Sequence, residues 1–206
     1  MSTIIGEAGT TLGLELAGTL MTPEEFDAIE EADEDYRYEL IRGVLIVSPS
    51  ASVEERDPNE ELGHWLRTYR EGHPQGSALD RTVSEQMVPV LQDRRRADRV
   101  IWAGLGRRPD LKADIPTIVV EFVSAGKRNR RRDYEQKRQE YLAVGVVEYW
   151  IIDRFRRTLT VVRNAAEGAQ EIVVGEADVY RTPVLPGFEL PLGRLLALAD
   201  DWATPQ

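Results

Sequence analysis

The chain has 206 residues, of which 42% are hydrophobic and 30% charged, and its net charge at pH 7 is −10. This composition excludes a disordered chain and is typical of one folded domain with a sizeable core. The sequence contains no cysteine, which excludes disulfides and thiolate metal sites and favours a reducing, cytoplasmic compartment. No apolar run approaches the ~20 residues of a membrane span, and the first residues lack the pattern of a signal peptide.

The negative net charge argues against a protein that coats nucleic acid, because phosphate binding depends on Lys and Arg. The charges are strongly segregated, however. Residues 24–35 carry only acidic charges, whereas residues 94–99 and 127–132 are mostly basic. A local basic surface is therefore still expected.

The first part of the chain predicts two helices and a hairpin. Residues 1–20 are expected to form an arm or a short edge strand. Thr-Pro-Glu-Glu starts a helix over 22–34, with Thr as its cap. Residues 38–47 predict a β-hairpin that turns at an Arg-Gly pair. A loop over 48–58 and an amphipathic helix over 59–69 follow.

The second part predicts strands around a central helix. Residues 82–91 and 99–102 are strands by composition, separated by a polar turn, and residues 104–116 predict a loop. A buried strand follows over 117–124. The remaining expected elements, in chain order, are a helix over 131–144 that ends at Gly145, a strand over 147–152, a hairpin of 158–163 with 170–175, a connector over 183–191 and a short helix over 192–198.

The strand over 117–124 reads Thr-Ile-Val-Val-Glu-Phe-Val-Ser. Such a run is typical of a strand that is covered on both faces. A carboxylate inside it is costly unless a cation, a metal or several hydrogen-bond donors meet it. We therefore interpret Glu121 as a metal ligand; a buried ion pair with an arginine is the alternative.

Asp98 lies at the start of the predicted strand 99–102, directly after the polar turn. If this strand neighbours that of Glu121, the two carboxylates can converge on one hard cation such as Mg²⁺ or Mn²⁺. Lys137, on the following helix, would stabilise developing negative charge or orient an attacking water. Asp133 lies one turn earlier on the same helix face.

Each of these side chains also has a structural interpretation. Asp98 can cap a helix or turn. Asp133 and Lys137 can form a solvent-exposed ion pair of small energetic value. Glu39, near the start of the predicted hairpin, can be a solvated residue at the edge of a strand. A zinc site is not expected, because the chain has two histidines and no cysteine.

The segment 127–132 reads Lys-Arg-Asn-Arg-Arg-Arg and joins the elements that carry Glu121 and Lys137. A solvated charged loop is its ordinary interpretation. Guanidinium groups beside a metal site are well placed to hold a phosphodiester backbone. The candidate nucleic-acid-binding residues are Lys127, Arg128, Arg130, Arg131 and Arg132.

Several short motifs are spread along most of the chain. They are Tyr38-Glu39-Leu40-Ile41 with Gly43, Asp98 on a strand, Val120-Glu121-Phe122-Val123-Ser124, Asp133-x-x-x-Lys137 with Tyr141, Gly145-Val146-x-Glu148-Tyr149-Trp150-Ile151-Ile152-Asp153, and Leu185-Pro186-Gly187-Phe188. Together they resemble the Uma-type family of restriction-endonuclease-like proteins in the PD-(D/E)xK superfamily.

The resemblance implies an α/β (α+β) restriction-endonuclease-like fold, with a central mixed sheet flanked by helices. It also implies a Mg²⁺-dependent site that hydrolyses phosphodiester bonds. Asp98 and Glu121 match the family's acids, and Glu39 matches a further family glutamate. Lys137 matches a lysine on the helix, which replaces the superfamily's strand lysine at the position of Val123.

Two departures from the family pattern bear on activity. Ala97 stands where a proline is usual, and the segment after Pro49 lacks the histidine that the family leads us to expect. Our leading hypothesis is a Mg²⁺- or Mn²⁺-dependent DNA endonuclease. The alternatives are an inactive module that binds nucleic acid or protein, and a homodimer through an edge strand within 158–175.

The expected domain organisation has three parts. An N-terminal arm spans residues 1–21, the restriction-endonuclease-like domain spans residues 22–198, and a C-terminal tail spans residues 199–206.

Overall fold

Residues Ile118–Phe122 form β7, a strand that is buried along its whole length, as its apolar composition predicts. The computed structural model describes residues 11–203, apart from the side chains of residues 128 and 129. Within the chain, contacts define two units. The larger unit contains Ser52–Gln86 and Ala97–Gln206, and β7 lies in its sheet.

The sheet around β7 is mixed. β7 pairs in parallel with β8 (Glu148–Asp153) and antiparallel with β6 (Asp93–Ala103). Beyond β8, the sheet continues with β9 (Thr158–Arg163) and then β10 (Gln170–Gly175) at its edge, and β5 (Leu79–Val90) pairs with β6. The hairpin of β9 and β10 therefore has the predicted bounds, and β10 is its edge strand.

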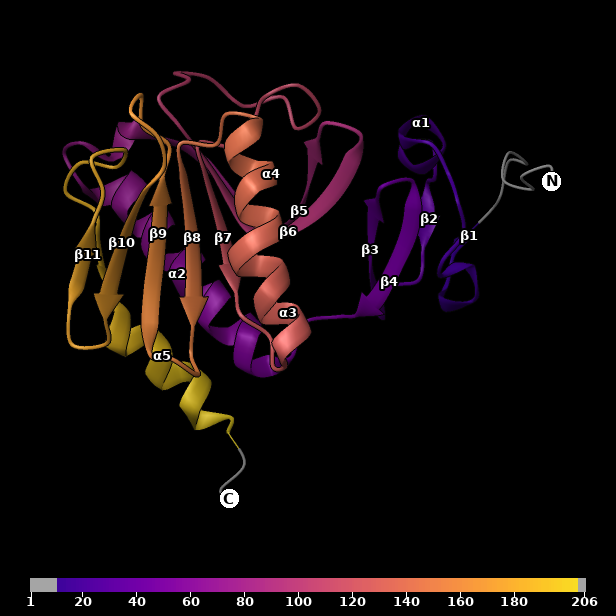
Figure 1. Ribbon diagram of the computed structural model, residues 1–206. Coiled ribbons are helices and arrows are strands. Elements are labelled where there is room, and N and C mark those ends of the chain that lie inside the picture. Colours follow the sequence, from indigo (N-terminus) through magenta and orange to yellow (C-terminus); the bar gives the residue numbers. More distant parts are fainter. Residues whose placement is uncertain (1–10, 204–206) are drawn as a thin grey trace. The chain divides into compact units, whose positions relative to one another are not determined.

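Helices cover both faces of this sheet (Figure 1). Behind the strands lies α2 (Val53–Gly72), against which α5 (Leu192–Asp201) packs. In front lies one continuous helical segment, made of α3 (Lys127–Arg131), the π-helical η3 (Arg132–Lys137) and α4 (Arg138–Ala143). Alternate residues of β7 join the core of the α2 face; they are Ile118, Val120 and Phe122.

The helical segment differs from the prediction at its beginning. The helix ends before Gly145, whose φ of +98° suits a glycine, as expected. It starts, however, at Lys127 rather than near Arg131. The basic run is therefore the first turn of a helix and not a loop. Arg and Lys are good helix formers, which explains the error.

Two further loop predictions were wrong. The loop over 48–58 contains the end of β4 and the first turns of α2, which begins at Val53. Pro58 is the sixth residue of that helix, so its missing N–H removes one intrahelical hydrogen bond, to the carbonyl of Glu54, near the start of the helix. The polar turn over 92–98 is mostly β6; the chain reverses between β5 and β6 at Leu91, where φ is +54°.

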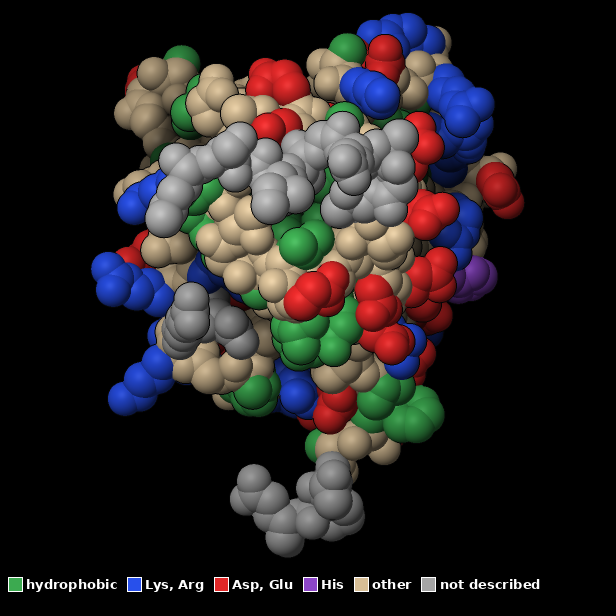
Figure 2. Space-filling view, turned by 90° about the vertical axis from the view of Figure 1, so that its right-hand side faces the viewer, with side chains coloured by type: hydrophobic (Ala, Val, Ile, Leu, Met, Phe, Trp, Pro, Cys, Tyr) green, Lys and Arg blue, Asp and Glu red, His purple; other side chains and the backbone are tan. Residues whose placement is uncertain are grey.

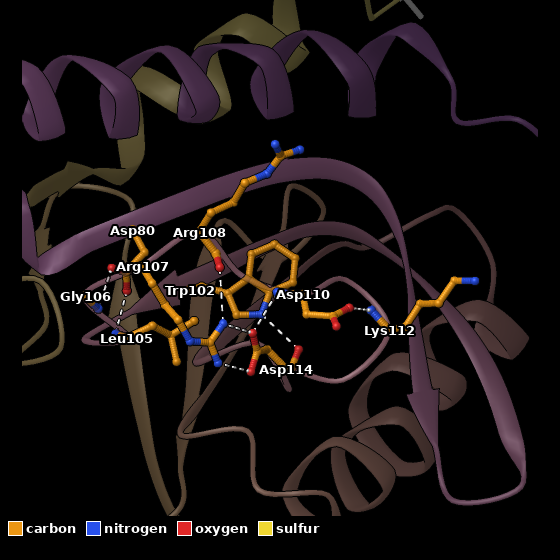
Figure 3. A network of polar contacts seen from close by, with 9 residues as sticks. All are labelled: Asp80, Trp102, Leu105, Gly106, Arg107, Arg108, Asp110, Lys112 and Asp114. Atoms are coloured by element: carbon orange, nitrogen blue, oxygen red, sulfur yellow. Dashed lines mark hydrogen bonds and ion pairs between the residues drawn. The ribbon is translucent and has the colours of Figure 1, made fainter.

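The loop between β6 and β7, residues 104–116, contains no helix or strand, as predicted, but its conformation is held by carboxylates (Figure 3). Asp80 on β5 accepts hydrogen bonds from the backbone N–H groups of Leu105 (2.7 Å) and Gly106 (2.9 Å). Arg107 binds Asp114 through two hydrogen bonds of 2.6 and 2.7 Å, and this contact lowers the pKa of Asp114 to about 2.

Short elements complete the larger unit. One is η2 (Gly76–Ala78), which lies between α2 and β5; the others are the paired strands β11 (Val179–Arg181) and β12 (Glu189–Pro191), which precede α5. The predicted connector over 183–191 thus ends in a strand. Among the described helices, none is both long enough and apolar enough to cross a membrane.

The smaller unit is built on the predicted hairpin. β3 (Tyr36–Ile41) and β4 (Val44–Pro49) pair antiparallel across Arg42 and Gly43. Both turn residues have positive φ, +52° and +73°, which suits the twist of a tight hairpin. The unit also contains Met87–Arg96, the hairpin end of β5 and β6.

The helix predicted over 22–34 is shorter in the structure. Thr22 caps α1 (Pro23–Asp27) through a reciprocal capping box with Glu25. The chain then forms β2 (Glu31–Ala32), which pairs in parallel with β1 (Thr11–Leu12). In the sequence, η1 (Leu14–Leu16) lies between β1 and α1. Residues 1–10 of the predicted arm lie outside the described residues.

Figure 2 shows acidic side chains gathered over part of one face. In the smaller unit, most acids of the stretch 24–35 are exposed to solvent, including Glu24, Glu31 and Asp35. The segregation of charge in the sequence therefore persists at the surface.

Candidate active site

Asp98 and Glu121 lie on neighbouring strands. In the antiparallel register of β6 and β7, Arg99 faces Val120, so Asp98 and Glu121 are the next positions along the two strands. The Asp98 carboxylate accepts a hydrogen bond of 2.6 Å from the backbone N–H of Phe122. Asp98 is buried in the interior of β6 rather than capping a turn, so the capping interpretation was wrong.

The partner of Glu121 is the predicted lysine. Lys137 Nζ lies 2.8 Å from Glu121 Oε1, and both side chains are at most 4% exposed. Tyr141 on α4 donates a hydrogen bond of 3.0 Å to the same oxygen. In the alternative interpretation, Glu121 forms a buried ion pair with an arginine. In the structure its partner is a lysine. The interpretation of Asp133 and Lys137 as a solvent-exposed ion pair was also wrong, because both side chains are buried.

Asp133 completes a buried cluster of charges. It lies one turn before Lys137 in η3 and is 1% exposed. Arg132 Nε lies 3.2 Å from its carboxylate, and Tyr149 on β8 donates a hydrogen bond of 3.0 Å to its backbone carbonyl. The wider turn of a π-helix, a geometry that recurs at functional sites, lets both Asp133 and Lys137 face the sheet.

The cluster is electrostatically costly. Burial raises the pKa of Glu121 to about 8; Asp98 and Asp133 add to the increase, and Lys137 opposes it. Burial also raises the pKa of Asp133, against the attraction of Lys137 and Arg132. The Tyr149 phenol, buried beside these acids, has a pKa well above its ordinary value. Such perturbed groups are typical of functional sites as well as of buried ion-pair networks.

The donor set of this cluster fits a magnesium-type ion. Asp98 and Glu121 offer the oxygen ligands that hard cations prefer. Among residues 11–203, no three or more His, Asp or Glu side chains form a group that could hold a metal by themselves. Mg²⁺ is ordinarily held by one or two carboxylates, with water and substrate phosphate completing its shell. Two adjacent acids therefore suit Mg²⁺ or Mn²⁺ better than a cation that needs a full protein cage.

Glu39 belongs to the smaller unit and is described by its contacts there. Its Oε1 accepts a hydrogen bond of 3.1 Å from the backbone N–H of Arg96, and its Oε2 lies 3.8 Å from Arg95 Nη1. Glu39 is 5% exposed. The interpretation of this residue as a solvated edge side chain was therefore wrong.

Residues 23–193 match the model of the Uma2 family, described as "Putative restriction endonuclease". The chain belongs to the Uma2 family. The predicted family resemblance is thereby confirmed, and the matched span includes Glu39, Asp98, Glu121 and Lys137.

A solved structure supports the same fold. The Uma2 chain is similar to the crystal structure of a putative nuclease belonging to DUF820 from Anabaena variabilis ATCC 29413. The identity is 16% and the TM-score 0.67, over 87% of this chain and 99% of the other. The predicted architecture, a mixed sheet flanked by helices, is confirmed. No curated protein matches the chain.

The basic run 127–132 of the Uma2 chain forms the start of the helical segment, and three of its arginines contact acids. Arg130 Nε lies 3.4 Å from Asp153, and Arg132 pairs with Asp133. Arg131 pairs with Glu135 on the surface and is 73% exposed. Lys127 is exposed, and the side chain of Arg128 lies outside the described part of the structure.

Sequence reasoning missed the support on the other face of β6. Arg99 is buried there and donates hydrogen bonds to the side-chain oxygen (2.7 Å) and the backbone oxygen (2.8 Å) of Asn59 on α2. Burial lowers the pKa of Arg99 to about 10. A Cβ atom on Gly63 would lie 2.6 Å from Arg99 Nη2. A glycine inside an amphipathic helix is the signal that could have revealed this close approach.

Proposed function

We propose that this Uma2 protein is a divalent-metal-dependent endonuclease that hydrolyses phosphodiester bonds in DNA. The observation that carries the proposal is the buried contact of 2.8 Å between Lys137 and Glu121, one strand away from Asp98. A lysine and two acids in one buried cluster are difficult to explain by stability alone, because burying charge is unfavourable. They are the groups that metal-assisted hydrolysis requires.

In this proposal, Asp98 and Glu121 hold Mg²⁺ or Mn²⁺. The bound ion would polarise a phosphoryl oxygen and lower the pKa of a water molecule. Tyr141 fixes the Glu121 carboxylate through its hydrogen bond of 3.0 Å. The hydrogen bond from the Phe122 backbone likewise fixes Asp98. Both acids are therefore oriented by elements of the fold before any substrate arrives.

Lys137 has the role of stabilising the negative charge that develops on the phosphoryl group, or of orienting the attacking water. Its attraction lowers the pKa of both Glu121 and Asp133, so its ammonium group interacts with two acids. This amine can turn toward a phosphate once a cation shares Glu121. Glu39 matches a family glutamate, and its functional role stays a prediction from that pattern.

The DNA backbone is proposed to bind at the start of α3. Lys127 and Arg131 are exposed there, and the segment follows β7 directly. Arg128, Arg130 and Arg132 belong to the same proposed surface. Guanidinium and ammonium groups at this place would contact phosphates and set the position of the duplex, without reading its sequence.

Nicking of supercoiled plasmid DNA with Mg²⁺ or Mn²⁺ tests the proposal. Asp98→Asn and Lys137→Ala should each reduce the rate by about 100-fold or more, as removal of a charge-stabilising group does. Matched controls are Glu167→Gln and Lys112→Ala, which change exposed residues elsewhere and should keep the wild-type rate. Equal rates in all five proteins, or nicking that survives EDTA, would remove the proposal.

A non-catalytic module that binds nucleic acid or protein is the second candidate. Its support is the net charge of −10 and the missing histidine after Pro49. Such a protein would gain no thermal stability from Mn²⁺, whereas a metal site in the folded state raises the melting temperature by mass action. Retention on a DNA column without a Mn²⁺ shift would favour this candidate.

A further inference from the structure

The turn between β8 and β9 combines an exposed aromatic ring with several guanidinium groups. Residues 154–157 read Arg-Phe-Arg-Arg, and Phe155 is 45% exposed. The guanidinium carbon of Arg154 lies 4.7 Å from the centroid of the Phe155 ring, and that of Arg130 lies 5.8 Å away. Arg156 lies 4.9 Å from the ring of Tyr134. The turn thus presents a layer of aromatic rings and guanidinium planes.

A buried carboxylate fixes this layer. Asp153, at the end of β8, is fully buried and accepts hydrogen bonds from the backbone N–H groups of Phe155 (2.9 Å) and Arg156 (3.0 Å). Its other oxygen lies 3.4 Å from Arg130 Nε and 3.3 Å from the Tyr134 hydroxyl. The turn and α3 are therefore held together, and Phe155 is presented to solvent by a rigid support.

The layer lies at the same edge of the sheet as the candidate active site. β7 and β8 run in parallel, and Glu121 is the register partner of Ile151. Asp153 is two residues beyond Ile151, which corresponds to about 7 Å along the strand. Arg130 comes from α3, which follows β7 at this edge. The turn and Glu121 thus lie at nearby positions along adjacent parallel strands.

We propose that Phe155, with Arg154 and Arg130, is a stacking platform for an unpaired base of single-stranded DNA beside the scissile phosphate. The proposal rests on the proposed nuclease function, since that function supplies the DNA. Bases stack on aromatic rings and on guanidinium planes alike, and arginines also contact the flanking phosphates.

The charge of the layer is what favours a nucleic acid over an apolar partner. Arg130 and Arg154 lie against the exposed ring and Arg156 lies over the ring of Tyr134, in a protein whose net charge is −10. Arg157 takes no part, because its guanidinium is paired with Glu176 and Asp200. Local positive charge around an aromatic ring is complementary to a single strand, which offers phosphates and base faces together.

Binding of a fluorescein-labelled single-stranded oligonucleotide of 20 nucleotides, measured by anisotropy in EDTA, tests the platform without cleavage. Phe155→Ala should weaken binding by about 5- to 100-fold, the range typical of one stacked base, and Phe155→Trp should restore it. The same variant should lose less affinity for a blunt duplex than for the single strand. The matched control is Leu111→Ala, in the loop that precedes β7, because Leu111 is equally exposed at 45%; it should bind like wild type.

Wild-type affinity in Phe155→Ala would overturn the proposal, as would equal losses for single strand and duplex, or failure of the wild-type protein to bind the single strand. The nicking assay is read separately. If wild type does not nick plasmid but the Phe155 series behaves as expected, the nuclease proposal fails and the platform stands. If wild type nicks and Phe155→Ala binds normally, only the platform fails.

Discussion

Two buried glutamates on neighbouring strands of the larger unit have very different surroundings. Glu148 on β8 is fully buried and both of its oxygens accept hydrogen bonds. The donors to Oε1 are Arg163 (2.9 Å) and Thr182 (3.0 Å), and those to Oε2 are Trp150 (2.9 Å) and Tyr180 (3.0 Å). This carboxylate ties β8 to β9 and to the segment around β11.

Glu121 on β7 is equally buried but is less well compensated. Lys137 and Tyr141 both reach the same oxygen, Oε1. Burial and the neighbouring acids Asp98 and Asp133 raise its pKa, in spite of the lysine. The comparison separates a structural carboxylate, which is satisfied on both oxygens, from one that the fold retains at an energetic cost. A retained cost of this kind is expected at a site of function.

The largest expected effect comes from the structural glutamate. Glu148→Ala leaves a partly buried arginine and three further donors without their acceptor, so the free energy of unfolding should fall by about 3–5 kcal/mol. Urea unfolding measures this loss. The nicking rate per folded molecule should stay close to that of wild type. A loss of less than about 1 kcal/mol would remove the contrast between the two glutamates.

Replacement of Glu121 and Lys137 together should have the opposite effect: the nicking rate should fall while the stability does not. The double variant Glu121→Gln with Lys137→Met removes both ionisable groups and keeps similar volumes. Its free energy of unfolding should equal that of wild type or exceed it, by up to about 2 kcal/mol, because buried ion pairs seldom stabilise relative to uncharged residues. Its nicking rate should fall at least about 100-fold. A destabilisation as large as that of Glu148→Ala would show that this pair, too, is structural.

The raised pKa of Glu121 predicts a specific dependence of stability on pH in metal-free protein. The folded state holds this proton up to about pH 8, whereas the ordinary value is 4.5. Stability from this group is therefore complete below pH 4.5 and is lost as the pH rises toward 8, by up to about 1.4 kcal/mol per pH unit. Chemical unfolding in EDTA from pH 5 to 9 measures the slope. The difference in the free energy of unfolding between wild type and Glu121→Gln should change with pH at this slope. Parallel curves of unfolding free energy against pH would contradict the prediction.

The smallest stability effect is expected at the surface. Arg131 and Glu135 form an exposed ion pair, 73% and 62% accessible, and Arg131→Ala should change the free energy of unfolding by less than about 0.5 kcal/mol. If Arg131 contacts a phosphate, the same variant should lower DNA affinity and reduce the slope of log affinity against log salt by about 1. An unchanged slope would exclude this arginine from the DNA surface.

The sequence predicted those parts of the site that depend on local pattern. A glutamate in an otherwise apolar strand had to be buried, and a glycine after the helix marked its end correctly. The position of Asp98 was less well predicted, because the polar residues 92–98 resemble a turn. In the structure most of them belong to the long strand β6, whose Arg95 and Arg99 are buried by tertiary contacts. No propensity scale contains that information.

Two further features depend on packing across the fold. The π-helical geometry of η3 brings Asp133 and Lys137 to the sheet, and a spacing of four residues equally predicts an exposed pair. The tyrosines that orient the site, Tyr141 and Tyr149, look like ordinary core residues in the sequence. Their hydroxyl groups acquire partners only when β7, β8 and the helical segment assemble.

The most direct test of a metal held by Asp98 and Glu121 is a crystal soaked in Mn²⁺ and measured at a wavelength that gives anomalous signal from manganese. We expect a peak within about 2.2 Å of one carboxylate oxygen of each residue, with Lys137 Nζ moved away from Glu121. The contradicting result is a crystal in which Mn²⁺ occupies other sites while Glu121 remains bound to Lys137.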